Sequence, residues 1–234
     1  MELYVGILAG GRSTRFGSNK CLFQIEGETL IARTLSTISA IKVAPKRVFI
    51  SLYKEFQLAE LLPHVSSILI KDARRGLSYS LKPSRERGED IPVEFVFDEA
   101  RQDVPENRAS IWGLLRVLQE VPRGYVQILP CDTPFFNAGV MNVFHAELEG
   151  LGDVDALIPR WRNGYIEPLH GIYKKEAMIG RVRNSVDRRA FKLSDLFRGC
   201  HSVKYFDIEG KLGRIDPTYK AFKNLNNLAD LPGR

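Results

Sequence analysis

Short apolar segments recur along this chain of 234 residues, and segments with helical periodicity separate most of them. The apolar segments predict strands at 3–8, 47–52, 93–98, 125–130, 156–159, 169–173 and 202–207. Helices follow most of these strands and are predicted at 29–39, 110–121, 176–186 and 194–197. Strands that alternate with helices favour an α/β fold, here a three-layer αβα sandwich around a mostly parallel central sheet.

The rest of the chain gives no sign of a second folding unit. No linker rich in Pro, Gly or Ser divides it, so we expect residues 1–234 to form a single domain. The segment 71–90 has the least regular pattern. Its Lys82-Pro83 pair and the run of charges at 85–90 predict a helix, a break and a solvated turn.

A glycine-rich turn with several cations directly follows the first predicted strand. Gly10 and Gly11 let the main chain approach an anion without a Cβ in the way, and Arg12, Arg15 and Lys20 come next. Backbone N–H groups and cations in this arrangement suit the phosphates of a nucleoside triphosphate. The spacing matches neither a Walker A loop nor a Rossmann dinucleotide-binding turn. An ordinary glycine turn with solvated charges is the alternative.

Two carboxylates come at the ends of other predicted strands. Asp132 follows the strand 125–130 shortly before Pro134, and Asp98 ends the strand 93–98. Open α/β sheets bind their ligands at the carboxyl ends of the strands, and Mg²⁺ prefers one or two carboxylates plus substrate phosphates. We therefore predict that Asp132 holds Mg²⁺, with Asp98 nearby on ribose, base or a metal-bound water. Capping of a turn by Asp132 is the alternative.

A third polar cluster lies near the end of the sequence. If residues 222–226 are extended, Asn224 and Asn226 point to one face and Leu225 to the other. Two side-chain amides offered together suit a phosphate, a ribose or a metal-bound water. An Asn-rich turn before a last short helix is the alternative.

Charge and cysteine content narrow the classes of partner. Lys and Arg total 34 against 28 for Asp and Glu, a net charge of +6 that favours anionic ligands. No basic block with interleaved aromatics occurs, so we do not expect nucleic acid as the partner. Cys21, Cys131 and Cys200 are far apart and odd in number, which favours a reducing compartment without structural zinc. No apolar run is long enough to cross a membrane, so we expect a soluble, cytoplasmic protein without a membrane partner.

Taken together, these motifs resemble the molybdenum cofactor guanylyltransferase family, within the nucleotidyltransferases of glycosyltransferase-A-like (nucleotide-diphospho-sugar transferase-like) fold. The glycine-rich motif of that family is matched at Leu8, Ala9, Gly10, Gly11, Ser13, Arg15, Gly17 and Lys20. Its C-D-x-P-F element is matched at Cys131, Asp132, Pro134 and Phe135. Its asparagine-containing tail is approximated at Phe222, Asn224, Asn226, Asp230 and Leu231.

The resemblance implies transfer of GMP from GTP to a phosphorylated, molybdopterin-type acceptor, with release of pyrophosphate and with Mg²⁺ as cofactor. The acceptor phosphate would attack the α-phosphorus in line, a reaction that needs positioning and charge neutralisation more than a general base. Arg15, Lys20 and Asp132 would be the catalytic residues. Transient contact with other proteins of cofactor biosynthesis is also implied. The residues implied to bind the nucleotide are Leu8, Ala9, Gly10, Gly11, Arg15, Lys20, Tyr53, Asp98 and Asp132, and those on the acceptor or metal side are Asn224 and Asn226.

One position keeps the identity of base and acceptor open. Tyr53 stands where the family usually places an Asn near the base. The alternatives are a cytidylyltransferase for the same cofactor, a guanylyltransferase acting on cobinamide phosphate or phospholactate, and a nucleotide-binding protein without turnover. A cluster of four arginines has two possible roles: it forms the solvated face of a helix, or it binds the acceptor phosphate. The cluster consists of Arg181, Arg183, Arg188 and Arg189.

Overall fold

Strand β1 (Leu3–Leu8) lies near the centre of the sheet in the computed structural model, which describes residues 1–10, 19–71, 78–84, 88–98, 110–200 and 202–225. β1 pairs in parallel with β4 (Val48–Leu52) on one side and with β8 (Tyr125–Pro130) on the other. β7 (Ile91–Phe97) pairs in parallel with β4. These central strands are mostly apolar along their whole length because helices cover both of their faces.

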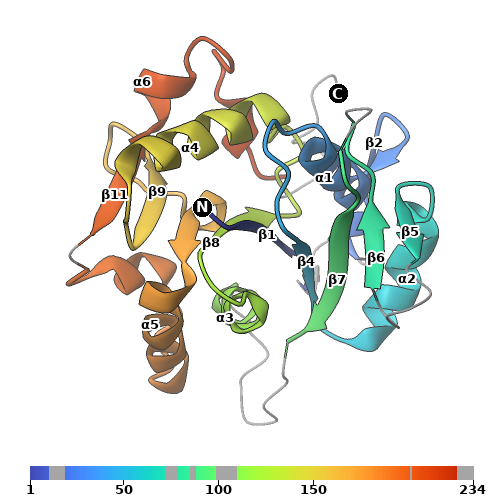
Figure 1. Ribbon diagram of the computed structural model, residues 1–234, viewed down its shortest axis with the longest axis horizontal. Coiled ribbons are helices and arrows are strands. Elements are labelled where there is room, and N and C mark those ends of the chain that lie inside the picture. Colours follow the sequence, from blue (N-terminus) through green and yellow to red (C-terminus); the bar gives the residue numbers. More distant parts are fainter. Residues whose placement is uncertain (11–18, 72–77, 85–87, 99–109, 201, 226–234) are drawn as a thin grey trace.

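Mixed strands flank this parallel centre. The described strands form a nine-stranded sheet of order β11-β9-β10-β8-β1-β4-β7-β6-β5 (Figure 1). β6 and β10 run antiparallel to their neighbours, whereas β11 pairs in parallel with β9. The outer strands are β5 (Leu69–Lys71), β6 (Ser78–Leu81), β9 (Ala156–Arg160), β10 (Ile172–Lys174) and β11 (Val203–Asp207). A separate hairpin consists of β2 (Gln24–Ile25) and β3 (Glu28–Thr29).

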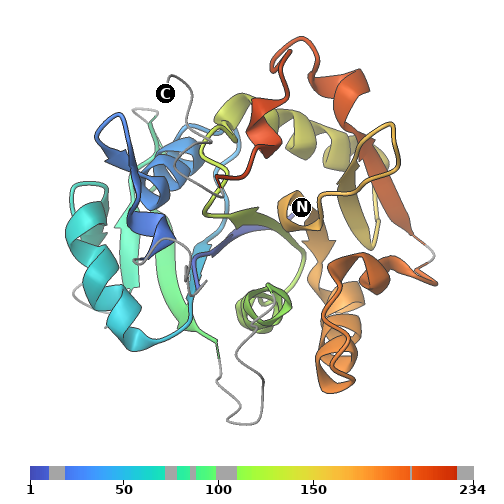
Figure 2. The same cartoon turned by 180° about the vertical axis from the view of Figure 1, so that it is seen from behind.

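Helices cover both faces of the sheet, as Figures 1 and 2 show from opposite sides. One layer consists of α1 (Leu30–Ser39), α2 (Glu55–Val65), α4 (Ala138–Leu151) and α6 (Ile208–Leu212). The other consists of α3 (Ile111–Glu120) and α5 (Lys175–Asp187). An apolar core lies between each helical layer and the sheet, and the side chains of β1 alternate between these two cores. Leu3, Val5 and Ile7 pack against the first layer and Tyr4 against the second. The predicted three-layer αβα sandwich is confirmed.

Three local predictions differ from the structure. The segment 71–90 does not contain a described helix but strand β6, which lies between β7 and the edge strand β5 and whose Tyr79 and Leu81 are buried in alternation with serines. The four residues of β6 repeat the alternating pattern only twice, and the charged residues that follow at 85–90 hide it. The predicted strand 169–173 starts later, at Ile172, because Pro168–His170 forms a turn of 3-10 helix. Residues Leu193–Phe197 are also 3-10 rather than α-helical.

Two further turns of 3-10 helix, at Lys20–Leu22 and Lys220–Phe222, bring distant parts of the chain to the carboxyl edge of the sheet. None of the helices described is both long enough and apolar enough to pass through a lipid bilayer.

Candidate functional site

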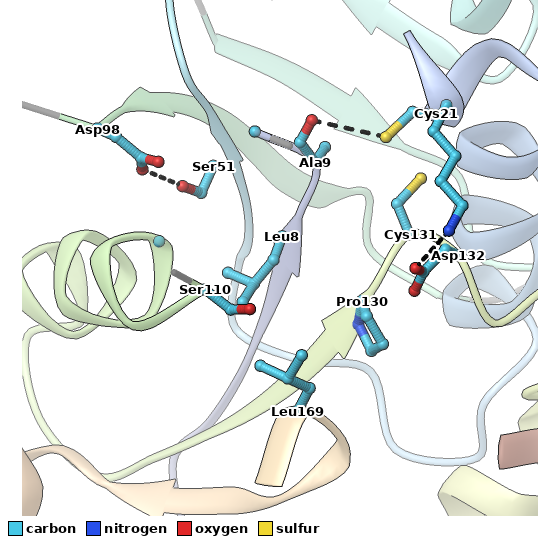
Figure 3. A pocket seen from close by; sticks show the side chains of 13 residues that line it. Leu8, Ala9, Cys21, Ser51, Asp98, Ser110, Pro130, Cys131, Asp132 and Leu169 are labelled. Carbon is cyan, nitrogen blue, oxygen red and sulfur yellow. Dashed lines mark hydrogen bonds and ion pairs between the residues drawn. The ribbon is translucent and has the colours of Figure 1, made fainter. Parts of the chain in front are cut away.

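A cleft opens at the carboxyl ends of the parallel strands. Its walls come from the end of β1, from Ser51 of β4, from Asp98 after β7, from residues 130–132 at the end of β8 and from the first turn of α3 (Figure 3). Lys20 and Cys21 close it from the 3-10 helix that follows the glycine-rich turn. Parallel strands all end at one edge, so residues that lie far apart in the sequence meet here.

An ion pair crosses this cleft. Lys20 Nζ donates a hydrogen bond to Asp132 Oδ2 at 2.8 Å, although the two residues lie 112 positions apart in sequence. The Lys20 side chain is 17% exposed and that of Asp132 30%, so both remain accessible from solvent. The structure therefore brings together the cation predicted for phosphate and the carboxylate predicted for metal.

Backbone contacts fix the positions of both charged side chains. Asn19 Oδ1 accepts a hydrogen bond from the Cys21 backbone N–H at 3.2 Å, which starts the 3-10 helix that carries Lys20. The Cys131 N–H donates to the Leu8 carbonyl at 3.3 Å and continues the pairing of β8 with β1 up to Asp132. Leu225 N–H donates to the Asp132 carbonyl at 2.9 Å. Asp132 is thus held from two sides by main-chain bonds.

Gly10 and Asp98 form a second part of the cleft. Ser51 Oγ donates to Asp98 Oδ1 at 2.6 Å. A Cβ on Gly10 would lie 3.0 Å from the Tyr53 backbone nitrogen and 3.2 Å from Asp98 Oδ2. Glycine is therefore needed at position 10 because the main chain passes so close to the neighbouring strand and to the carboxylate.

Asn224 lies on the other side of Asp132. A wider groove adjoins the cleft there, and its lining includes Asp132, Asn224 and Ser110 together with the segments 164–170 and 191–194. The tail is not a strand at this point, because Phe222 ends a 3-10 turn and residues 223–225 are irregular.

Several predicted site residues lie elsewhere or outside the description. Gly11, Arg15 and Asn226 fall outside the described residues. Tyr53 is described, but it is buried, its N–H donates to Gln57 Oε1 at 2.7 Å, and it is not among the residues that line the cleft. The other described residues of the predicted nucleotide site, Leu8, Ala9, Gly10, Lys20, Asp98 and Asp132, all line it.

Sequence reasoning missed several residues of the cleft, among them Ser51, Gly113 and Cys21. Ser51 is a polar residue within the otherwise apolar strand β4, and that interruption is the signal that could have found it. Gly113 lets α3 approach β1 and β4, because a Cβ there would lie 3.0 Å from Leu8 Cδ2 and 3.2 Å from Ser51 Oγ. Cys21 had no signal beyond its place next to Lys20.

His170 lies beside the groove but is a packed residue. Its ring sits between Phe136 and Phe222, with centroids 4.9 Å and 5.1 Å away, and its Nε2 is 3.1 Å from Thr133 Oγ1. Burial lowers the pKa of His170 to about 3, so the ring is neutral and a weak base near pH 7. Burial and a hydrogen bond with Cys21 raise the pKa of the Cys131 thiol well above its usual range, the hydrogen bond contributing most.

The four arginines predicted either for a solvated face or for the acceptor lie in α5 and just after its end. Arg183, Arg188 and Arg189 are exposed, and Arg181 donates to the carbonyl oxygens of Arg198 and Gly199 at 3.4 Å and 3.2 Å. None of the four is among the residues that line the cleft or the groove in the described part of the chain. The solvated-face interpretation fits these positions.

The donor set around Asp132 suits a metal that is shared with a substrate. Within the described ranges no group of three or more His, Cys, Asp or Glu side chains could hold a metal alone. Asp132 Oδ2 already carries a cation in the structure, the Lys20 ammonium. One accessible carboxylate that attracts a cation fits Mg²⁺, which completes its shell with phosphate oxygens and water.

Comparisons with known proteins agree with this geometry. Residues 5–200 match the family described as the MobA-like NTP transferase domain. A protein of Pyrococcus horikoshii named probable molybdenum cofactor guanylyltransferase is 30% identical over 235 residues, covering 99% of this chain and 98% of the relative.

Solved structures show the same fold. Molybdopterin-guanine dinucleotide biosynthesis protein A from Archaeoglobus fulgidus superposes with a TM-score of 0.67 at 24% identity, covering 97% of this chain and 94% of that one. The 2-C-methyl-D-erythritol 4-phosphate cytidylyltransferase of Thermus thermophilus gives a TM-score of 0.56 at 16% identity, with 98% and 95% covered.

Proposed function

Because the chain belongs to the MobA-like NTP transferase family, we propose that it transfers GMP from GTP to the phosphate of molybdopterin, with release of pyrophosphate, in the biosynthesis of the molybdenum cofactor. The relative from Pyrococcus horikoshii carries the name of that activity and aligns over nearly its whole length. The continuous sheet supports treating residues 1–234 as one transferase domain.

The observation that carries the proposal is the ion pair between Lys20 and Asp132 inside the cleft. A protein that only bound a nucleotide would need the cation but not a carboxylate facing it, since a carboxylate repels phosphate. The pairing of a phosphate-binding cation with a metal-binding carboxylate favours turnover at this point.

We assign the described residues as follows. Leu8, Ala9 and Gly10 bring the main chain close to the triphosphate, and Asp98, held by Ser51, lies at the far end of the same cleft for ribose or base. Gly11 and Arg15 belong to this phosphate-binding group by their place in the motif. Tyr53 would act near the base through its backbone, which lies against Gly10.

Nucleotidyltransferases of this family generally depend on a divalent metal ion, and we propose Mg²⁺, held by Asp132. When bound, the ion supplies positive charge to the phosphate oxygens. An ammonium and a metal ion cannot both occupy Asp132 Oδ2 at contact distance. We propose that the Lys20 ammonium moves from Oδ2 to the phosphates when the metal and nucleotide bind, and that it stabilises the leaving pyrophosphate there.

The groove beside Asp132 is the candidate acceptor side. Asn224 and Ser110 offer neutral polar groups there, and Asn226 extends the same tail. An acceptor phosphate is already ionised near pH 7, so it needs no general base to attack the α-phosphorus. Buried, neutral His170 fits a structural role beside this groove.

The test is pyrophosphate release by the purified protein with molybdopterin, Mg²⁺ and each of GTP, CTP, ATP and UTP, with the product identified by mass. Of the four triphosphates, we expect only GTP to support pyrophosphate release with molybdopterin. Release with CTP and not with GTP would show that the transferred base is cytosine. Release with GTP only when cobinamide phosphate or phospholactate replaces molybdopterin would show that the acceptor is a different one. No release with any combination, together with nucleotide binding, would show a binding protein.

The three unpaired cysteines favour a cytoplasmic site of action, and transient contact with partner proteins of the same biosynthesis remains part of the proposal.

A further inference from the structure

Two thiols meet in the floor of the cleft. Cys21 and Cys131 are each 5% exposed, both line the cleft, and their thiols lie close enough to interact with each other. Figure 3 shows the two sulfur atoms side by side between Ala9 and Asp132. Neither cysteine forms a disulfide in the structure.

The surrounding contacts keep these thiols together. Cys21 Sγ lies 3.6 Å from the Ala9 carbonyl oxygen, and Cys131 N–H donates to the preceding carbonyl, that of Leu8, at 3.3 Å. Both cysteines are therefore attached to consecutive residues at the end of β1. The ion pair of their chain neighbours, Lys20 and Asp132, adds a second contact at 2.8 Å between the same two segments. A disulfide needs such a fixed, close approach of two backbones.

We propose that Cys21 and Cys131 form a reversible intramolecular disulfide when a hydroperoxide enters the cleft, and that this bond switches the enzyme off. Hydrogen peroxide oxidises one thiol to a sulfenic acid and releases water. The second thiol attacks that sulfur, forms the S–S bond and releases a second water. Two thiol sulfurs are thereby oxidised and the two peroxide oxygens reduced. A dithiol reductant returns both thiols.

The loss of activity follows from the neighbours, and this part rests on the proposed function. The new bond would tie the backbone next to Lys20 to the backbone next to Asp132. Transfer requires the Lys20 ammonium to leave Asp132 for the phosphates, and a covalent link one residue away on both sides opposes that movement.

Cys200 supplies an internal control. It is only half-buried and lies after the 3-10 turn Leu193–Phe197, where its Sγ donates to the Leu196 carbonyl at 3.3 Å. It does not line the cleft among the described residues. The proposal requires the peroxide-dependent cross-link to join the cleft pair and to leave out this more accessible thiol.

The experiment treats the purified protein with hydrogen peroxide, blocks remaining thiols, and maps the cross-linked peptides by mass before and after dithiothreitol. We expect a peptide pair joined through Cys21 and Cys131, with Cys200 blocked as a free thiol. The same cross-link is expected in Cys200→Ser and in neither Cys21→Ser nor Cys131→Ser. Guanylyl transfer should fall at least tenfold on oxidation in wild type and Cys200→Ser, and dithiothreitol should restore it.

Each variant is compared with its own activity before oxidation, so a basal effect of Cys21→Ser does not disturb the result. Cys21→Ser should keep its starting activity within twofold after peroxide. Absence of the cross-link, a cross-link through Cys200, or equal inactivation of Cys21→Ser overturns the proposal. The cross-link is read by mass and needs no activity. An inactive protein that forms it therefore refutes the proposed transferase, whereas an active protein that does not form it refutes the switch.

Discussion

Replacement of Lys20 by methionine should separate catalysis from stability. The change keeps most of the apolar stem and removes the ammonium that lies 2.8 Å from Asp132. If Lys20 stabilises charge in the transition state, kcat/KM should fall by roughly 10²- to 10³-fold, or about 2.7–4 kcal/mol. Its contribution to folding should be much smaller.

The small effect on folding follows from exposure. Asp132 is already 30% exposed with Lys20 in place, so water can solvate the carboxylate that is left behind when Lys20 is removed. Partly solvated ion pairs contribute about 1 kcal/mol or less to stability. In a domain of this size that corresponds to a loss of about 2–4 °C in Tm.

A matched control is available outside the cleft and the groove. Lys211 of α6 pairs with Glu147 of α4 at 2.7 Å, with side chains 40% and 26% exposed. Lys211→Met should change Tm about as little as Lys20→Met and leave kcat/KM unchanged.

The assays are steady-state pyrophosphate release and a thermal melt on the three proteins. A kinetic loss below threefold for Lys20→Met would refute its catalytic role. A fall in Tm large enough to account for the kinetic loss would instead identify Lys20 as a structural residue.

Asp132→Asn should abolish Mg²⁺-dependent turnover while the protein stays folded, and an unchanged metal titration would contradict the role of that carboxylate.

Three further changes test the surroundings of the site. Gly10→Ala should lower the free energy of unfolding by about 1–3 kcal/mol, because its Cβ would lie 3.0 Å from the backbone nitrogen that follows β4. The same change at exposed Gly180 in α5 meets nothing within 4 Å and should raise it by about 1 kcal/mol; urea denaturation giving the same sign for both would contradict the packing argument. Ser51→Ala removes a 2.6 Å hydrogen bond to the cleft carboxylate and should reduce kcat/KM about tenfold, so an unchanged value would show that this carboxylate needs no orientation. Burial lowers the pKa of His145 to about 4 and that of His170 to about 3. Both stay neutral in the folded state while the unfolded chain takes up protons below about pH 6.5, so stability is full above that pH and falls as pH falls, by up to about 1.4 kcal/mol per pH unit for each histidine. His145→Leu should flatten the profile measured by urea between about pH 7 and pH 5, and an unaltered slope would contradict the sign.

Local sequence pattern was enough for the central framework of this protein. The bounds of β1 and β8 are those predicted, and β4, β7 and α1 differ by only one or two residues at their ends. Buried parallel strands are unbroken apolar runs, and amphipathic helices have a period that a single segment displays. The glycine-rich motif and the Asp after β8 were equally visible because each depends on neighbours in the chain.

The tertiary structure decided what these segments meet. The contact of Lys20 with Asp132, the link of Ser51 to Asp98 and the pairing of Cys21 with Cys131 all join segments that lie far apart in the sequence. Such contacts depend on strand order, and no local period encodes whether β8 lies beside β1 or elsewhere in the sheet. Strand β6 escaped prediction for a related reason, since four residues with half-buried serines are stabilised mainly by the backbones of the neighbouring strands β5 and β7.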